Sequence, residues 1–216
     1  MRRLSTTSRF ALIAAGIATA SILHEEIAAY SSNGRTWSRT PVAFVVNPAN
    51  LDLPAAEVEA AVRVGADVWG LQTNASFGFT YAGRSGQATN TNDGVNLVVF
   101  RNASNASAIA TTYWWSNSSG IIDADIVFWD ASFRFFSGTS GCSGGFYIED
   151  IAAHEFGHAL GIGHSTSASA TMYPSVSSCN SRNRTLDADD IAGVEALYPP
   201  RGIPPAPPTG FRVVGQ

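Results

Sequence analysis

The sequence predicts an α+β fold with a mixed, twisted β-sheet, and three observations support this fold class. The chain has 216 residues, which is the size of one ordinary domain. Hydrophobic residues make up 45% and charged residues 14%, so the chain can bury a core and is not a disordered tail. Strand-like segments come early and helix-like segments late, with one helix between the first two strands. That order is typical of α+β domains.

The first part of the domain is predicted to contain one helix and five strands. The helix covers Ala55–Leu71, where acidic residues come early and apolar residues recur at helical spacing. The strands are short segments rich in β-branched and aromatic residues. They are predicted at Arg39–Asn47, Phe77–Ala82, Val95–Phe100, Ile109–Trp115 and Ile121–Trp129.

The second part is predicted to contain two helices. A glycine-rich loop over Ser137–Gly145 precedes a helix from about Ile148 to Gly161. A last helix over Ala188–Leu197 closes the domain. The sequence then becomes proline-rich, so residues 199–216 are expected to form a linker and a truncated or disordered tail.

The N-terminus has the pattern of an export signal. Three arginines precede the apolar run Phe10–Ala20, and cleavage is expected after Ala20 or Ala29. The signal then covers residues 1–29, and a secreted domain covers residues 30–198. The alternative is that this segment forms an N-terminal helix of the fold. No later segment has 18 consecutive apolar residues, so no membrane span is expected.

The charged residues and the cysteines exclude several protein classes. The 13 basic residues are all arginine and the net charge is −4, which argues against a nucleic-acid partner. Two cysteines are too few for a disulfide framework or a four-cysteine zinc site. In an exported protein Cys142 and Cys179 are expected to form a disulfide, the alternative being a free reactive thiol.

Three of the four histidines lie in one motif, HEFGHALGIGH at residues 154–164, while His24 falls in the predicted signal. His154 and His158 are four residues apart, so on a helix they lie roughly 40° apart and about 6 Å along the axis. Both can therefore bind one zinc ion. Glu155 can then reach a water held by the metal, accept its proton as a general base and later donate it as an acid.

Gly161 and Gly163 are predicted to end this helix, so that His164 returns as the third ligand. Three protein ligands leave one position open, which is typical of a catalytic rather than a structural zinc. The alternative is that the histidines are ordinary surface or core residues. Their fixed spacing beside a glutamate argues against that interpretation.

These residues carry a resemblance to a known family. HEFGHALGIGH, followed by Ala-Thr-Met-Tyr-Pro at residues 170–174, resembles the metzincin zinc endopeptidases and, among them, the matrixins. The similarity extends over roughly Trp37–Tyr198. It implies a zincin-like fold with an active-site helix and a C-terminal helix, one catalytic zinc, and Met172 beneath it in a Met-turn that leads into Pro174. Tyr173 is not expected to be a ligand.

The resemblance implies a secreted endopeptidase that acts on proteins or peptides, and we expect a monomer. An extended substrate is expected to pair with strand Ile109–Trp115, and Pro174–Val176 to form a wall of the side-chain pocket. Asp150 lies one helical turn before His154, which allows two interpretations. Either it alters the pocket with an acidic group, or it is a first-turn acid that interacts favourably with the helix dipole.

Calcium is a second candidate cofactor, because several aspartates lie in the region where oxygen ligands are expected, although aspartates in turns more often cap them. These residues are Asp93, Asp123, Asp125 and Asp130. Two other functions stay open. One is a zinc amidase acting on a non-protein substrate, and the other is a catalytically silent secreted binding module.

Overall fold

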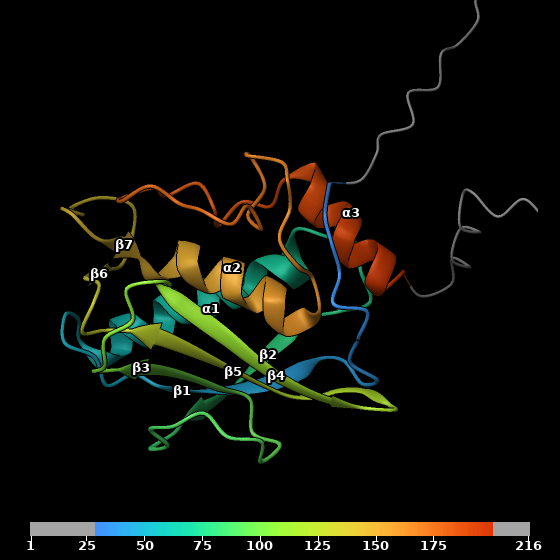
Figure 1. The fold of residues 1–216 in the computed structure, drawn as a ribbon, viewed down its shortest axis with the longest axis horizontal. Coiled ribbons are helices and arrows are strands. Elements are labelled where there is room, and N and C mark those ends of the chain that lie inside the picture. Colours follow the sequence, from blue (N-terminus) through green and yellow to red (C-terminus); the bar gives the residue numbers. More distant parts are fainter. Residues whose placement is uncertain (1–28, 201–216) are drawn as a thin grey trace, which may run out of the picture.

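The structure is a computed structural model that describes residues 29–200, so the predicted signal up to residue 28 and the tail from residue 201 lie outside the described residues. A five-stranded sheet in the order β2-β1-β3-β5-β4 is accompanied by three helices (Figure 1). The strands are β1 (Val42–Asn47), β2 (Phe79–Arg84), β3 (Leu97–Arg101), β4 (Ala110–Asn117) and β5 (Gly120–Trp129). The helices are α1 (Ala55–Leu71), α2 (Ile148–Leu160) and α3 (Ala188–Leu197).

The sheet is mixed, as the sequence predicts. Strands β2, β1, β3 and β5 pair in parallel, whereas β4 returns antiparallel to β5 and forms one edge of the sheet. The α+β fold class is therefore confirmed. Because β4 is an edge strand, one side of its backbone has no partner strand within residues 29–200.

Helices α1 and α2 pack against each other on one side of the sheet (Figure 1). Gly65 of α1 allows this close approach, because a Cβ there would lie 2.5 Å from the Cβ of Ala152. The indole Nε1 of buried Trp69 donates a hydrogen bond to the carbonyl of Ala153 at 2.9 Å. These contacts fix α2 in the main core, and α2 is the helix that carries most of the histidine motif. Within residues 29–200 no helix is both long and apolar enough to cross a membrane.

The observed elements agree closely with the predicted ones. Helices α1 and α3 have the predicted bounds, α2 ends one residue early, and the five strands are shifted by up to three residues. Strand β1 begins only at Val42, because Pro41 has no N–H to donate. The sequence did not predict β6 (Phe135–Phe136) and β7 (Phe146–Tyr147), which pair with each other. Two-residue strands are too short to show a periodic pattern.

Candidate metal centre and active site

The C-terminal end of α2 brings the histidine motif together. The helix carries His154, Glu155 and His158, and its C-cap Gly161 is left-handed with φ 116°. A Cβ at Gly161 would also lie 2.4 Å from the carbonyl oxygen of Arg35, so glycine is required there on two counts. The chain turns after Gly161 and returns His164 towards the helix, as predicted.

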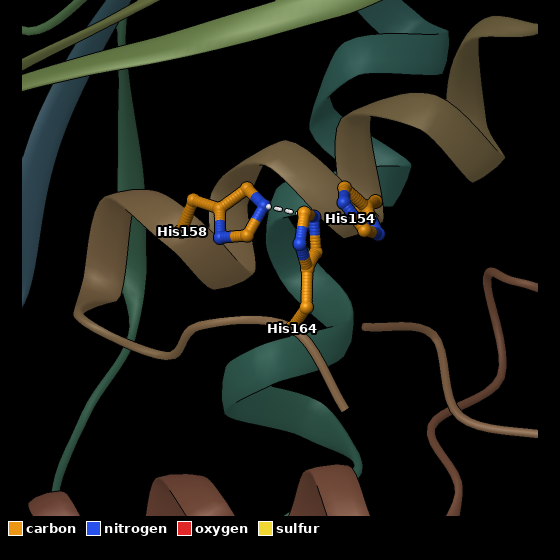
Figure 2. A group of neighbouring side chains, drawn as sticks. All are labelled: His154, His158 and His164. Carbon is orange, nitrogen blue, oxygen red and sulfur yellow. Dashed lines mark hydrogen bonds between the residues drawn. The ribbon is translucent and has the colours of Figure 1, made fainter. Parts of the chain in front are cut away.

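Figure 2 shows the three imidazoles facing one another, two from α2 and one from the returning segment. One ligand atom from each histidine lies within 4.8 Å of the others. The Nε2 atoms of His158 and His164 are 3.2 Å apart. Two imidazole nitrogens on one tetrahedral zinc lie about 3.3 Å apart, given Zn–N bonds of roughly 2 Å. The spacing of this pair therefore suits zinc.

Hydrogen bonds to backbone carbonyls orient the two helical imidazoles. The Nδ1 of His154 lies 2.8 Å from the carbonyl oxygen of Thr171, and the Nδ1 of His158 lies 2.9 Å from that of Ile162. Since a carbonyl can only accept, both rings carry a proton on Nδ1, which leaves the Nε2 lone pairs for a metal. Burial lowers the pKa of both histidines to about 4, so both are neutral near pH 7.

Met172 lies in the core beneath α2. Its Sδ would be 2.2 Å from a Cβ at Gly157, so the thioether packs directly against the helix between the two histidines. The turn is fixed by the buried carboxylate of Asp190 in α3, which accepts hydrogen bonds from the amides of Thr171 at 2.7 Å and Met172 at 3.0 Å. The carbonyl of Thr171 in turn binds His154. Asp190 thus supports the histidine through the turn.

Glu155 is buried, with 6% of its surface exposed, and burial raises its pKa because the charged form is disfavoured. The Oγ1 of Thr112 in β4 lies 2.7 Å from Glu155 Oε2 and 3.0 Å from the backbone carbonyl of Glu155. One hydroxyl proton can therefore be donated to either oxygen. The contact orients the carboxylate between α2 and the edge strand, beside the histidines.

A cavity of about 650 Å³ lies against this cluster. The three histidines, Glu155 and Thr112 are among the residues that line it. The segment after Met172 also lines the cavity, including the predicted wall residues Pro174, Ser175 and Val176.

Asp150 does not line the cavity within the described residues. It is almost fully buried, and its Oδ2 accepts a hydrogen bond from the Nε of Arg184 at 2.9 Å. Of the two interpretations of this acid, a pocket altered by a free carboxylate is therefore not supported. The predicted disulfide between Cys142 and Cys179 is present, and it ties the wall segment to the loop before α2.

Within residues 29–200, no three of the four aspartates considered for calcium bring their carboxylate oxygens close enough together to share one ion. Within residues 29–200 the histidine triad is the one group of three or more side chains placed to share a metal. Asp125 instead accepts hydrogen bonds from the amides of Thr91 and Leu97, both at 2.8 Å, and Asp123 binds two further amides of the same loop. Burial raises the pKa of Asp125 to about 6. Calcium stays a prediction without a set of ligands to support it.

Sequence reasoning missed two residues of the site, Thr112 and Asp190. The sequence contains a pattern that could have pointed to Asp190, because Asp187 and Asp190 have the spacing of a capping box. In the structure they form that box at the start of α3. Thr112 had no such pattern. It is one inward-facing position of a strand, and its contact with Glu155 spans 43 residues of sequence.

Comparison with known proteins agrees with the geometry. The family model described as matrixin, Peptidase_M10, matches residues 36–199, which is more than half of the chain. Human neutrophil collagenase is 26% identical over 172 residues, covering 75% of this chain and 33% of that protein. Human matrix metalloproteinase-20 is 51% identical over 59 residues, covering 27% and 12%. Rat matrilysin is 43% identical over 60 residues, covering 28% and 22%.

The chain therefore spans no more than 33% of the length of each of these relatives. The family match covers both the sheet and the three helices of the described domain. It also contains the whole histidine motif, the Met-turn and the edge strand beside them. On this ground, the chain belongs to the matrixin family.

Proposed function

We propose that this chain is a secreted zinc-dependent endopeptidase, with His154, His158 and His164 as the zinc ligands and Glu155 as the general base and acid. The observation that carries the proposal is the arrangement of these groups around one cavity: three imidazoles at zinc-ligand spacing and a buried carboxylate beside them. Three nitrogen donors leave a position for water and substrate, as in catalytic zinc sites.

Bound zinc would supply a Lewis acid that polarises the substrate carbonyl and makes water more acidic. Glu155 accepts the proton of the attacking water and delivers it to the leaving amine. Its burial raises its pKa, which suits a carboxylate that must both accept and return a proton near neutral pH. Thr112 holds the carboxylate in place, and the carbonyls of Thr171 and Ile162 hold the two helical imidazoles.

Three further residues support the site structurally. Met172 packs beneath α2, Gly161 permits the turn that returns His164, and Pro174 leads from the Met-turn into the cavity wall. Within the described part of the chain β4 has no partner strand on its outer edge, and such an edge suits an extended polypeptide, which adds main-chain hydrogen bonds to the sheet. We expect proteins or peptides as substrates and a monomer as the active form.

Cleavage of a protein-derived peptide library by the purified protein, read by mass spectrometry, tests the proposal. We expect cleavage that a chelator stops and added zinc restores. Absence of chelator-sensitive cleavage would refute the endopeptidase. Hydrolysis restricted to non-protein amides would instead identify a zinc amidase. Recovery of a protein starting near residue 21 or 30 from culture medium tests secretion, and retention of residues 1–29 inside the cell would refute it.

A further inference from the structure

Part of the cavity wall is formed by a segment without regular secondary structure, which we call the wall segment. Residues 173–176 and Asn183 line the cavity, and the chain from Tyr173 to the start of α3 contains neither helix nor strand. Val176 packs against the main core. Such a segment has no ladder of backbone hydrogen bonds to hold it, so its position depends on individual contacts.

The first set of contacts joins the wall segment to the loop that precedes α2. The disulfide connects Cys179 to Cys142, the amide of Cys179 donates to the carbonyl of Gly145 at 2.9 Å, and the hydroxyl of Ser178 donates to the same oxygen at 3.0 Å. Gly145 is itself fixed, because a Cβ there would lie 2.4 Å from the carbonyl oxygen of Arg134. The wall is thus attached to a tightly packed point just before α2.

The second set of contacts joins the end of the wall segment to α2 itself. The Nε of Arg184 donates to Oδ2 of Asp150 at 2.9 Å, and its Nη1 donates to the carbonyl of Gly138 at 2.8 Å. The Asp150 side chain is 1% exposed and that of Arg184 is 15% exposed. A shielded pair with several charge-assisted hydrogen bonds holds its geometry closely. Asp150 lies one helical turn before His154 on α2. The contact between Arg184 and Asp150 therefore holds the wall segment at a fixed position relative to the histidines.

We propose that the Cys142–Cys179 disulfide and the Arg184–Asp150 pair together set the width of the substrate side-chain pocket. Cys179 and Arg184 are positioning residues: they touch no reacting atom, but they hold the wall at a fixed distance from α2. This inference rests on the proposed function, since the pocket matters only if a substrate side chain enters it. The pocket should then discriminate between large and small side chains more sharply than an untethered loop can.

The test compares wild type with the Cys142→Ser/Cys179→Ser double variant and with Arg184→Gln. Ser181→Ala is the matched control, because Ser181 lies in the same segment and belongs to neither of the two sets of contacts. Each protein is assayed with two peptides that differ only after the cleaved bond, one with leucine and one with glycine. Zinc content is measured alongside kcat and KM, and hydrogen exchange is followed in residues 173–185.

We expect the Cys142→Ser/Cys179→Ser variant and the Arg184→Gln variant each to keep one zinc per chain and a kcat within about twofold of wild type. KM for the leucine peptide should rise roughly tenfold, which is the size of a loosened pocket contact, while KM for the glycine peptide stays constant. Exchange in residues 173–185 should become faster, and Ser181→Ala should behave as wild type.

The inference would be overturned if the two variants had the wild-type KM for the leucine peptide and the wild-type rate of hydrogen exchange. It would also be overturned if the variants lost both zinc and kcat. A wild-type protein that does not cleave either peptide would refute the proposed function instead. The hydrogen-exchange measurement then still tests whether the disulfide and the Arg184–Asp150 pair hold the wall. If exchange in residues 173–185 is the same in the variants as in wild type, the two contacts do not hold it.

Discussion

The hydrogen bond between Thr112 and Glu155 connects the edge strand to the carboxylate that we propose as the general base. Burial alone would favour a protonated Glu155, and a hydroxyl donor on Oε2 opposes that effect by stabilising the charged form. The same hydroxyl fixes the rotamer of a side chain that must face the neighbouring histidines. At this scale, therefore, we expect the proposed chemistry to depend on a residue outside the histidine motif.

Replacing Thr112 with valine removes the hydroxyl and keeps the shape of the side chain. We expect kcat to fall roughly tenfold, because a hydrogen bond to a charged group contributes about 1.5 kcal/mol or more. Zinc content and KM should stay near wild type. Thr112→Ser, which keeps the donor, should recover most of the lost kcat in the same steady-state assay. Equal kcat for the valine and serine variants would contradict the role of the hydroxyl.

At the scale of elements, α3 supports His154 of α2 through the Met-turn. Asp190 accepts hydrogen bonds from both amides of the Met-turn, and the turn gives the carbonyl that orients His154. The side chain of Asp187 caps α3 by accepting a hydrogen bond from the amide of Asp189. The first turn of the closing helix thus contributes to the position of the Met-turn and, through the Thr171 carbonyl, to that of the His154 ring.

Asp190→Asn should weaken zinc binding by about 10- to 100-fold, the range found when partners that orient metal ligands are replaced. The amide nitrogen of asparagine cannot accept a hydrogen bond, so one of the turn contacts is lost. Competition with a chelating dye measures the affinity. Asp187→Asn is the control, because asparagine also caps helices well and the charge change is the same. Equal affinities for the two variants would show that the turn does not depend on Asp190.

The contrast between what sequence could and could not predict follows element type. The bounds of helices α1 and α3 were predicted to the residue, and in the 17-residue α1 the 3.6-residue period extends over several turns. The histidine motif was equally predictable from the sequence, since its three histidines lie within eleven residues. Contacts between distant elements were not. Thr112 on Glu155, Arg184 on Asp150 and the short β6–β7 pair depend on packing that no local pattern encodes.

On the scale of the whole molecule, the N-terminal part of the described chain holds the segment that carries His164. Residues 29–37 run beside the end of α2 and the start of α3 (Figure 1). The hydroxyl of Ser31 donates to the carbonyl of His164 at 2.8 Å, and the amide of Tyr30 donates to Asp189 at 3.0 Å. The third histidine is therefore held by a segment more than 130 residues away in sequence. Zinc binding should stabilise this assembly as a unit.

Removal of zinc should lower the thermal midpoint of unfolding by roughly 5–10 °C. A ligand at a hundredfold excess over its Kd stabilises by about 2.7 kcal/mol, and each kcal/mol shifts the midpoint by about 2–4 °C in a domain of this size. Calorimetry with and without a chelator measures the shift. His164→Ala provides the comparison, because its midpoint should no longer respond to the chelator. If the thermal midpoint of the wild-type protein is the same with and without the chelator, the result would argue against a bound structural or catalytic metal.

The most direct test of the whole account is the kcat of Glu155→Gln at a zinc content matched to wild type. If the histidines bind the metal and Glu155 moves the proton, the variant should hold one zinc per chain and cleave peptides at least about 100-fold more slowly, as expected for loss of a general base. Cleavage by the zinc-loaded variant at the wild-type rate would contradict the assigned mechanism.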